Sequence, residues 1–349
     1  MKKHLIALSL TLTAGLFAPN LNAEDWFAPS KKGGDAAANN ANWLTVGPQF
    51  GLNINARFDH AGNVNPASPG PATGSGVDRT YNDGFVHVDS SGDAGSQTWN
   101  WGYQNAPQAQ GSTLTMHSAS IAAAGKSEQN SDLNPGFDLA FGHRLGTVLG
   151  GSWGVQAAFD FTDVSIDDNH PLSGTGTLIS DAFSLGRTTP PQAPYSGSFN
   201  GPGPLLGDSP TRTTMTDTIQ ITGQRKLDAQ VCALRAGPYF EFPFGKQWSG
   251  RFGGGLAVAI VETSYSYNET MTFGSGPVIN STGSSSGAEV GVGGYLDGKL
   301  LYAVTPETSF FAGAQYEYLG KFSRTAGGEQ AQLDMNSAVY LLLGVQVSF

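Results

Sequence analysis

Eight stretches of the chain alternate apolar and polar residues with a period of two, which is the period of a β-strand. In the first stretch, residues 43–58, Leu44 and Phe50 fall on one face and Gln49 and Asn53 on the other. The other seven are residues 136–144, 153–162, 231–244, 251–260, 289–304, 309–320 and 337–349. A strand that crosses a bilayer needs about 9–11 residues with one face toward lipid. The alternation therefore predicts an all-β fold with membrane-crossing strands.

The connections between these stretches alternate between long and short. The longest are residues 59–135 and 167–226, and the shortest are residues 145–151, 245–248 and 305–308. This is typical of an antiparallel up-and-down transmembrane β-barrel with long extracellular loops and short periplasmic turns. We expect eight strands, or ten if residues 114–120 and 217–223 are also barrel strands. A secreted β-sandwich is the rival fold, but its connections show no strict alternation of this kind.

The first stretch contains one awkward feature. Residues 43–58 predict a single strand with Leu44 through Phe58 facing lipid, yet Pro48 lies inside it and cannot donate a ladder hydrogen bond. The same Gly-Pro pair recurs at Pro238 in a later stretch. We therefore expect a bulge or a local kink at both prolines.

The N-terminal residues have the pattern of a secretory signal peptide. Lys2 and Lys3 precede an apolar run, residues 5–18, and Ala23 ends a small-residue cleavage site. The run is too short to span a bilayer as a helix. The expected organisation is residues 1–23 as signal peptide, 24–42 as periplasmic N-terminal tail and 43–349 as barrel.

The composition excludes some partners. The formal net charge is −10, with only 18 Lys and Arg, so we expect no nucleic-acid partner because such binding needs a basic surface. The 48 glycines fit many turns and close strand contacts better than long helices. Cys232 is the only cysteine, so the exported chain has no internal disulfide.

The C-terminal stretch "GVQVSF" resembles the last strand of bacterial outer-membrane β-barrels, which ends in Phe with apolar residues at alternate positions before it. The matching residues are Leu343, Val345, Val347 and Phe349. By strand number the chain resembles the small OmpA-type and OmpW-type barrels of Gram-negative bacteria. The resemblance implies a place in the outer membrane, contact with its lipid, and recognition of this strand by the barrel-assembly machinery.

The lumen-facing positions of the predicted strands carry charges of both signs. They are Arg57, Asp138, Arg144, Asp160, Arg235, Glu241, Arg251, Glu289, Asp297, Lys299 and Glu317. An eight-stranded barrel is just wide enough for its side chains to fill it, and charges there must pair. We expect this network to plug the barrel; the alternative is a charged path for ions.

Sequence motifs for catalysis are weak. Ser285 lies in a "GSSSG" that matches the nucleophile elbow in letters only, because that elbow needs a strand-to-helix turn. The stretch is better explained as a flexible linker. His117 precedes Ser118 and Ser120, but the spacing differs from the His-x-Ser that outer-membrane lipid A deacylases are known for. We therefore expect no enzyme, with a lipid-modifying activity as a remote third hypothesis, and no cofactor.

The first long loop holds the candidate binding residues. Asp83, Asp89 and Asp93 are hard oxygen ligands, but their spacing is not that of an EF-hand, so we predict no metal site and keep them as weak candidates. Trp99, Trp101 and Tyr103 cluster beside Asn and Gly, which suits contact with an extracellular carbohydrate or protein ligand and equally suits packing of the loop onto the barrel rim. The expected function is a structural or surface-interaction role of the long loops; the alternative is a small porin-like channel for ions or amphiphilic solutes.

Overall fold

The computed structural model describes residues 41–60, 67–274 and 278–349, without the side chains of residues 122 and 123. The described residues are nearly all in strands and turns, and their one helical element is a short 3-10 turn, η2 (Ala106–Gln108). In this part of the chain, no helix has the length and apolar character needed to cross a membrane. The predicted signal peptide and most of the predicted N-terminal tail, residues 1–40, lie outside the described residues.

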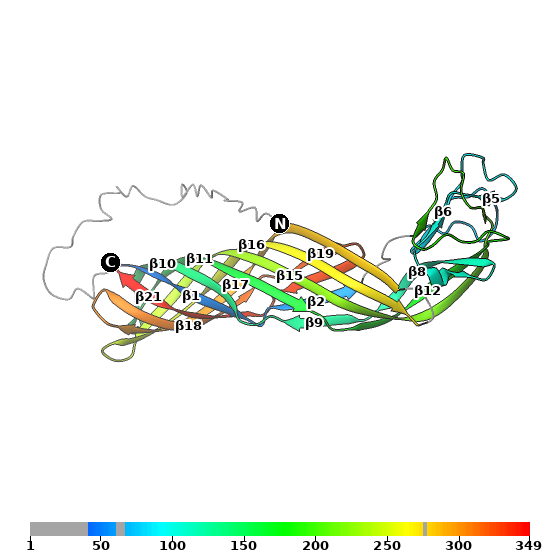
Figure 1. Cartoon of the computed structure of the whole chain (residues 1–349). Helices are drawn as coiled ribbons and strands as arrows, with labels where there is room; N and C mark the ends of the chain where they lie inside the picture. Colours follow the sequence, from blue (N-terminus) through cyan, green and yellow to red (C-terminus); the bar gives the residue numbers. More distant parts are fainter. Residues whose placement is uncertain (1–40, 61–66, 275–277) are drawn as a thin grey trace. The chain divides into compact units, whose positions relative to one another are not determined.

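Eight antiparallel strands form a closed ring (Figure 1). In chain order they are β1 (Asn42–Leu52), β10 (Asn134–Val148), β11 (Gly151–Asp168), β15 (Thr211–Pro243), β16 (Trp248–Phe273), β17 (Val278–Ala303), β18 (Thr308–Tyr318) and β21 (Ala338–Ser348). Each pairs with the next one in this order, β11 pairs with β15, and β21 returns to β1. The predicted eight-stranded up-and-down barrel is confirmed.

The two extra segments considered for ten strands are both β-structure but do not enlarge the ring. Residues 114–120 lie in β8 (Thr113–Ala124), which pairs with β12 (Leu172–Ser184), and β12 pairs in turn with β15. Residues 217–223 belong to β15 itself. Much of the predicted loop 167–226 is therefore an extension of strand structure beyond the ring. The predicted "GSSSG" linker is likewise wrong, because Ser285 lies within β17 and is paired with Tyr265 of β16.

The first predicted strand is two strands. β1 ends at Leu52, Asn53 adopts a left-handed conformation with φ of 57°, and β2 (Asn55–His60) follows. β2 joins a separate four-stranded sheet with β9 (Lys126–Asn130), β20 (Glu329–Asp334) and β19 (Lys321–Ala326). The turn reverses the faces, so that Phe58 is buried inside rather than facing lipid. Arg57 consequently points out of the core, half-exposed, and binds Asp59, so its predicted place in the lumen is wrong.

No bulge forms at the two prolines. The register of β1 with β10 runs unchanged through Pro48, and that of β11 with β15 through Pro238. On the other side of each strand, pairing is interrupted at the Gly-Pro pair and resumes in the same register. A Cβ on Gly47 would lie 1.8 Å from the Leu343 carbonyl oxygen, and one on Gly237 would lie 2.0 Å from that of Gly254. The glycines therefore permit a close strand approach where the proline removes a donor.

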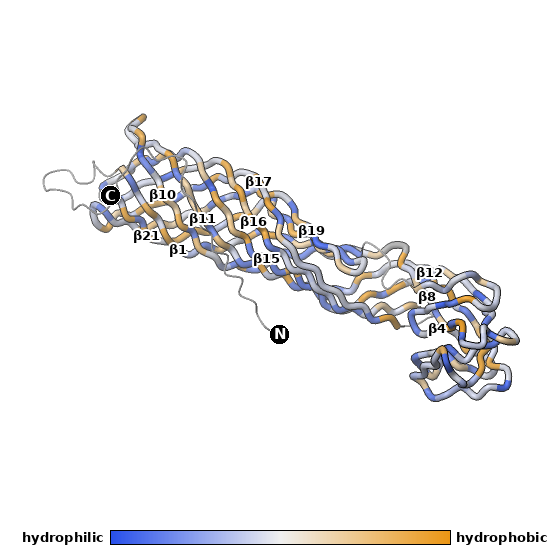
Figure 2. Tube along the Cα trace, turned by 90° about the horizontal axis from the view of Figure 1, so that it is seen from above, coloured by the Kyte–Doolittle hydropathy of each residue, from blue (hydrophilic) through white to orange (hydrophobic). Residues whose placement is uncertain are grey.

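The outer surface of the ring carries an apolar belt. On β16 the exposed residues Phe252, Leu256, Val258 and Ile260 are followed at the next outward positions by Glu262, Ser264 and Ser266. The belt continues on β17 from Leu300 to Val290. Figure 2 shows apolar residues alternating with polar ones along β10, β11 and β16. We define the membrane-spanning segments as the parts of the strands that this belt covers.

The two long loops fold together into a small β-structure, which we call the head (residues 67–110 and 185–210). Its main sheet contains β3 (Arg79–Tyr81), β4 (Gly84–Val86), β6 (Trp101–Tyr103) and β13 (Tyr195–Ser196). A second pairing joins β5 (Gln97–Thr98) to β14 (Leu206–Gly207), and β7 (Ala109–Gln110) pairs with β8. Trp101 of the head is fully buried in one cluster with Leu114 of β8 and Phe183 of β12. Each of these two sheets therefore combines strands from both long loops.

Candidate functional site

A layer of charged side chains crosses the barrel interior at the level of the belt. Arg235 lies between two carboxylates: its Nε donates to Asp160 Oδ2 at 2.7 Å, and its Nη2 donates to Asp138 Oδ2. Lys299 Nζ lies 3.5 Å from the other Asp138 oxygen. All four side chains are at most 2% exposed. The cations are therefore interleaved with the anions in this layer.

The other predicted members of the network divide into groups. Asp297 and Glu317 are buried in the same barrel interior, and Gln156 Nε2 donates to Asp297 Oδ1 at 2.8 Å. Arg251 forms a separate pair, because its Nε donates to Glu241 Oε2 at 3.0 Å and its guanidinium lies 3.8 Å from the Trp43 ring centroid.

The remaining two members lie apart from this layer. Arg144 is half-buried near the barrel end where β1 begins, and its backbone N–H donates to Ala41 O. Glu289 instead binds Arg324 of β19.

An apolar core fills the interior beyond the charged layer, toward the extracellular end. Ala257, Ala259 and Val261 of β16 are fully buried there and meet Val231 and Ala233 of β15. The same cluster includes residues from β2, β19 and β20. The four-stranded sheet thus contributes side chains to the same interior as the barrel strands. Because these core side chains have almost no exposed surface, the described part of the interior is packed and not open.

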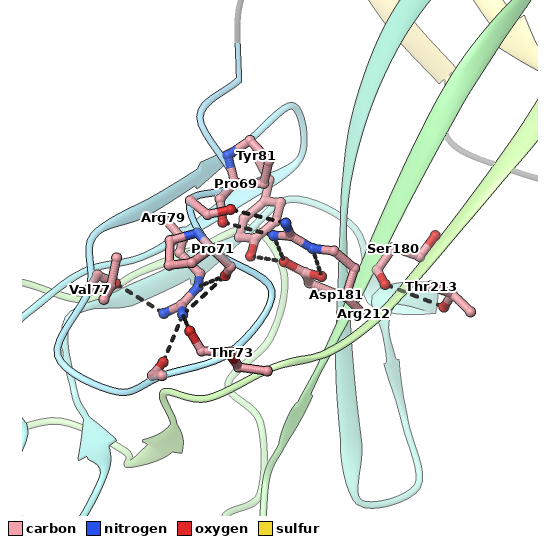
Figure 3. Close-up of polar contacts among 12 residues, drawn as sticks. Pro69, Pro71, Thr73, Val77, Arg79, Tyr81, Ser180, Asp181, Arg212 and Thr213 are labelled. Carbon is pink, nitrogen blue, oxygen red and sulfur yellow. Dashed lines mark hydrogen bonds and ion pairs between the residues drawn. The ribbon is translucent and has the colours of Figure 1, made fainter.

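The head is tied to β12 and β15 by a buried ionic cluster that sequence reasoning missed (Figure 3). Tyr81 Oη donates to Asp181 Oδ2 at 2.6 Å, and Arg212 Nε donates to Asp181 Oδ1 at 2.8 Å. Arg79 is fully buried and donates to five backbone carbonyls, among them Gly74 O at 2.7 Å. These residues are far apart in the sequence and follow no motif, so no local signal could have joined them.

The three loop aspartates do not converge. Asp83 accepts from the His117 ring at 2.6 Å and from the His117 backbone N–H at 2.7 Å. Asp89 accepts from Ser91 and from the Trp99 backbone N–H. Burial opposes ionisation of Asp89, but these hydrogen bonds outweigh it and lower its pKa below the usual range. The carboxylates order loop backbone, and they do not form a common ligand set among the described residues.

The predicted aromatic contact is largely buried. Trp101 and Tyr103 lie in the head core, so their predicted role as exposed contacts is wrong. Trp99 is half-buried, and its indole N–H donates to Phe199 O at 3.2 Å. Residues at alternate positions of a short strand can face a core. The prediction of a long loop at residues 59–135 gave no reason to expect such a core.

A polar groove of about 610 Å³ lies beside the head. Its lining is rich in amides and hydroxyls and contains one carboxylate. The residues are Ala67, Thr80, Tyr81, Asn82, Asp83, Gln104, Asn105, Val278, Ile279 and Asn280. The groove therefore brings the first long loop next to the tip of β17, and it can donate and accept hydrogen bonds without a basic side chain.

A second buried cluster lies above the apolar core, outside the membrane-spanning segments. It contains His60 of β2, Glu329 of β20 and Glu269 of β16, with Arg225 of β15 against Glu269. Burial, together with the charge of Glu329, raises the pKa of Glu269 to about 8. No sequence pattern singled out these residues, because all four lie between the eight alternating stretches, where loops were predicted.

Comparison with known proteins gives structural neighbours only. No family model and no curated protein matches the sequence. Ail of Yersinia pestis, solved with the heparin analogue sucrose octasulfate, is 9% identical with a TM-score of 0.28, over 88% of this chain and 99% of Ail. Neisserial surface protein A is 13% identical with a TM-score of 0.27, over 68% and 94%. These scores are low, so the closed ring and the apolar belt carry the identification.

The fold is that of an outer-membrane β-barrel, as the closed ring and the apolar belt show. A place in the outer membrane of a Gram-negative envelope stays a prediction from the sequence, and this fold supports it. The roles of the individual site residues, including the C-terminal assembly signal of Leu343, Val345, Val347 and Phe349, stay predictions.

The prediction that the chain is not an enzyme is wrong as an inference from this architecture. The outer membrane protease OmpT from Escherichia coli is another structural neighbour, 11% identical with a TM-score of 0.30, over 89% of this chain and 97% of OmpT. Barrel architecture alone excludes no activity, so the expectation of no enzyme does not stand.

Proposed function

We propose that the protein is a closed outer-membrane barrel that displays its head for binding an extracellular ligand. The observation that supports this most strongly is the packed interior. Arg235 is held between two carboxylates at the level of the belt, and fully buried Ala257, Ala259 and Val261 pack beyond it. A barrel filled in this way supports the head and offers little room for a solute.

The groove beside the head is the proposed binding surface. Asn82, Gln104 and Asn105 present amides, and Asp83 adds a carboxylate whose partner is His117. Neutral amides can donate to and accept from the hydroxyl groups of an uncharged saccharide, and a carboxylate can accept from them. A sulfated or phosphorylated ligand fits less well, because the lining holds no Lys or Arg and the chain carries a net charge of −10.

The experiment measures binding of fluorescent, uncharged oligosaccharides to the purified protein in detergent. Gln104→Ala and Asn280→Ala remove exposed amides of the groove and should weaken binding about ten-fold each, which corresponds to loss of one or two hydrogen bonds. Asn268→Ala is the control, because this exposed residue lies on the outer face of β16 away from the groove. Binding that all three variants leave unchanged would contradict the proposal.

The channel hypothesis has its own measurement. Planar bilayers containing the protein should show no steady unit conductance, because solute would have to pass both the charged layer and the apolar core. A steady conductance that changes on neutralising Arg235 would overturn the closed barrel.

A further inference from the structure

Three strands from distant parts of the sequence bring His60, Glu269 and Glu329 together inside the extracellular part of the barrel. His60 and Glu329 are register partners at the end of the β2–β20 ladder, and Glu329 directly follows the Gly327-Gly328 turn of the β19–β20 hairpin. Glu269 comes from β16. One ligand atom from each of the three lies within 4.8 Å of the other two. Residues from three separate elements thus converge on one point.

The polar groups at this point are buried and only partly paired. The side chains of His60, Glu269 and Glu329 are each 1% exposed. His60 Nδ1 contacts Glu329 and Glu269 Oε1 contacts Arg225 Nε, whereas His60 Nε2 and Glu269 Oε2 have no hydrogen-bond partner among the described residues. An unsatisfied buried polar group costs about 1–3 kcal/mol, and more when it is charged. Two such atoms beside two neighbouring carboxylates indicate a site for an added cation.

The charges at the cluster do not balance. Arg225 is the buried cation, and it is shared, because its Nη1 lies 2.9 Å from Asp168 Oδ2 while its Nε faces Glu269. Two carboxylates, those of Asp168 and Glu269, therefore share one guanidinium, while Glu329 contacts His60 and Asp168 also contacts the exposed His170. A dication bound to a neutral imidazole would balance the ionised cluster, since buried charges require a partner or a metal.

We propose that His60, Glu269 and Glu329 bind a divalent transition-metal ion, of which Zn²⁺ fits the ligand set best. One imidazole and two carboxylates are typical zinc ligands, with bonds of about 2.0–2.2 Å. At such bond lengths, tetrahedral ligand atoms lie roughly 3.4 Å apart. To admit the ion, side-chain rotation would open the direct contact between His60 and Glu329 and bring the carboxylate of Glu269 toward both.

The ion would hold two sheets together. β2 and β20 belong to the four-stranded sheet, whereas β16 belongs to the barrel sheet, and the described strand pairings do not join β16 to either of them. A metal bound by all three would link the two sheets across the packed interior. This site is independent of the proposed ligand groove, and either proposal can fail without the other.

The test uses the full-length protein, purified in detergent, stripped with EDTA and titrated with ZnCl₂ against a chromophoric chelator. We expect one tightly bound equivalent of zinc. Glu329→Gln and His60→Gln should each weaken it at least ten-fold. Glu262→Gln, an outward-facing residue on the same strand as Glu269, and His143→Gln, an exposed histidine near the barrel end, should bind zinc as the wild type does. Equal zinc binding by the wild type and a His60→Gln/Glu329→Gln double variant would overturn the site.

A stability readout covers variants that fold poorly. Zinc should raise the temperature at which the wild-type barrel loses its compact, heat-modifiable band on electrophoresis. Glu269→Gln removes a buried charge and keeps the shape of the side chain, so it should fold without zinc and lose the zinc-induced rise. A rise of the same size in Glu269→Gln would contradict the proposal, as would Ca²⁺ binding more tightly than Zn²⁺.

Discussion

Two buried ionic clusters lie in the interior of this protein, and they are built differently. In the membrane-spanning part, Arg235 separates Asp138 from Asp160, so that each carboxylate meets a cation. In the extracellular part, Glu269 and Glu329 face each other across His60. In the first arrangement cations alternate with carboxylates, whereas in the second an imidazole and two carboxylates converge on one point. The difference indicates that the first holds strands in register and the second is built for an added cation.

The largest expected effect comes from removing the cation of the interleaved cluster. Arg235→Ala leaves Asp138 and Asp160 buried without their partner, which should cost about 3–5 kcal/mol. Urea unfolding in detergent, followed by the heat-modifiable band, measures the loss. A variant as stable as the wild type would show that the network does not hold the barrel.

The convergent cluster should respond to pH when no metal is bound. Burial, with the charge of Glu329, raises the pKa of Glu269 from 4.5 to about 8, so between these values the folded protein holds a proton that the unfolded chain has lost. Its contribution to stability is present below about pH 4.5 and falls as pH rises to about 8.

Unfolding of EDTA-treated protein at several pH values measures this slope. The matched comparison is Glu269→Gln, in which the same range of pH should give a flatter curve. Added zinc should flatten the wild-type curve too, because it stabilises the ionised form. A wild-type stability that rises between these two pH values would contradict the argument.

Single carboxylate neutralisations should have opposite signs in the two clusters. Asp138→Asn weakens the pairs with Arg235 and Lys299 and should destabilise the barrel by about 1–3 kcal/mol. Glu329→Gln relieves repulsion from Glu269 in metal-free protein and should leave stability unchanged or raise it by about 1 kcal/mol. The same unfolding assay compares both, and equal losses would remove the distinction between the clusters.

The ring and its belt could be predicted because lipid requires apolar residues at the outward positions of each strand. Above the belt the rule reverses: on β16 the outward residues up to Ile260 are apolar, whereas beyond it the inward ones, such as Val261 and Tyr265, are apolar. A shift of the apolar residues by one position along a continuous strand therefore marks the membrane rim. The first stretch hides this shift, because the turn at Asn53 reverses the faces while the apolar residues keep the same parity.

The candidate sites were harder to predict for a related reason. Pairing in the lumen follows from facing positions on neighbouring strands, so the contact of Arg235 with Asp160 was within reach of the alternation. The proximity of His60 and Glu269 could not be predicted from the alternation. It depends on a reversal at Asn53 and on a second sheet whose pairing links residues almost 270 positions apart in the chain, as between His60 and Glu329. Alternation describes one strand at a time and contains no information about such partners.

The smallest expected effect tests the reversal itself. If Arg57 were part of the lumen network, Arg57→Ala would cost as much as removing Arg235. In the structure it lies on the outer face of the four-stranded sheet, with 36% of its side chain exposed, and its Nε donates to Asp59 Oδ2 at 2.9 Å. A pair of this kind contributes about 0–1 kcal/mol, and salt screens it. Unfolding of Arg57→Ala should therefore match the wild type in high salt, whereas Phe58→Ala, whose side chain is fully buried in the core, should lose about 3–5 kcal/mol. If Arg57→Ala instead lost more stability than Phe58→Ala, Arg57 would lie inside and the first strand would be continuous.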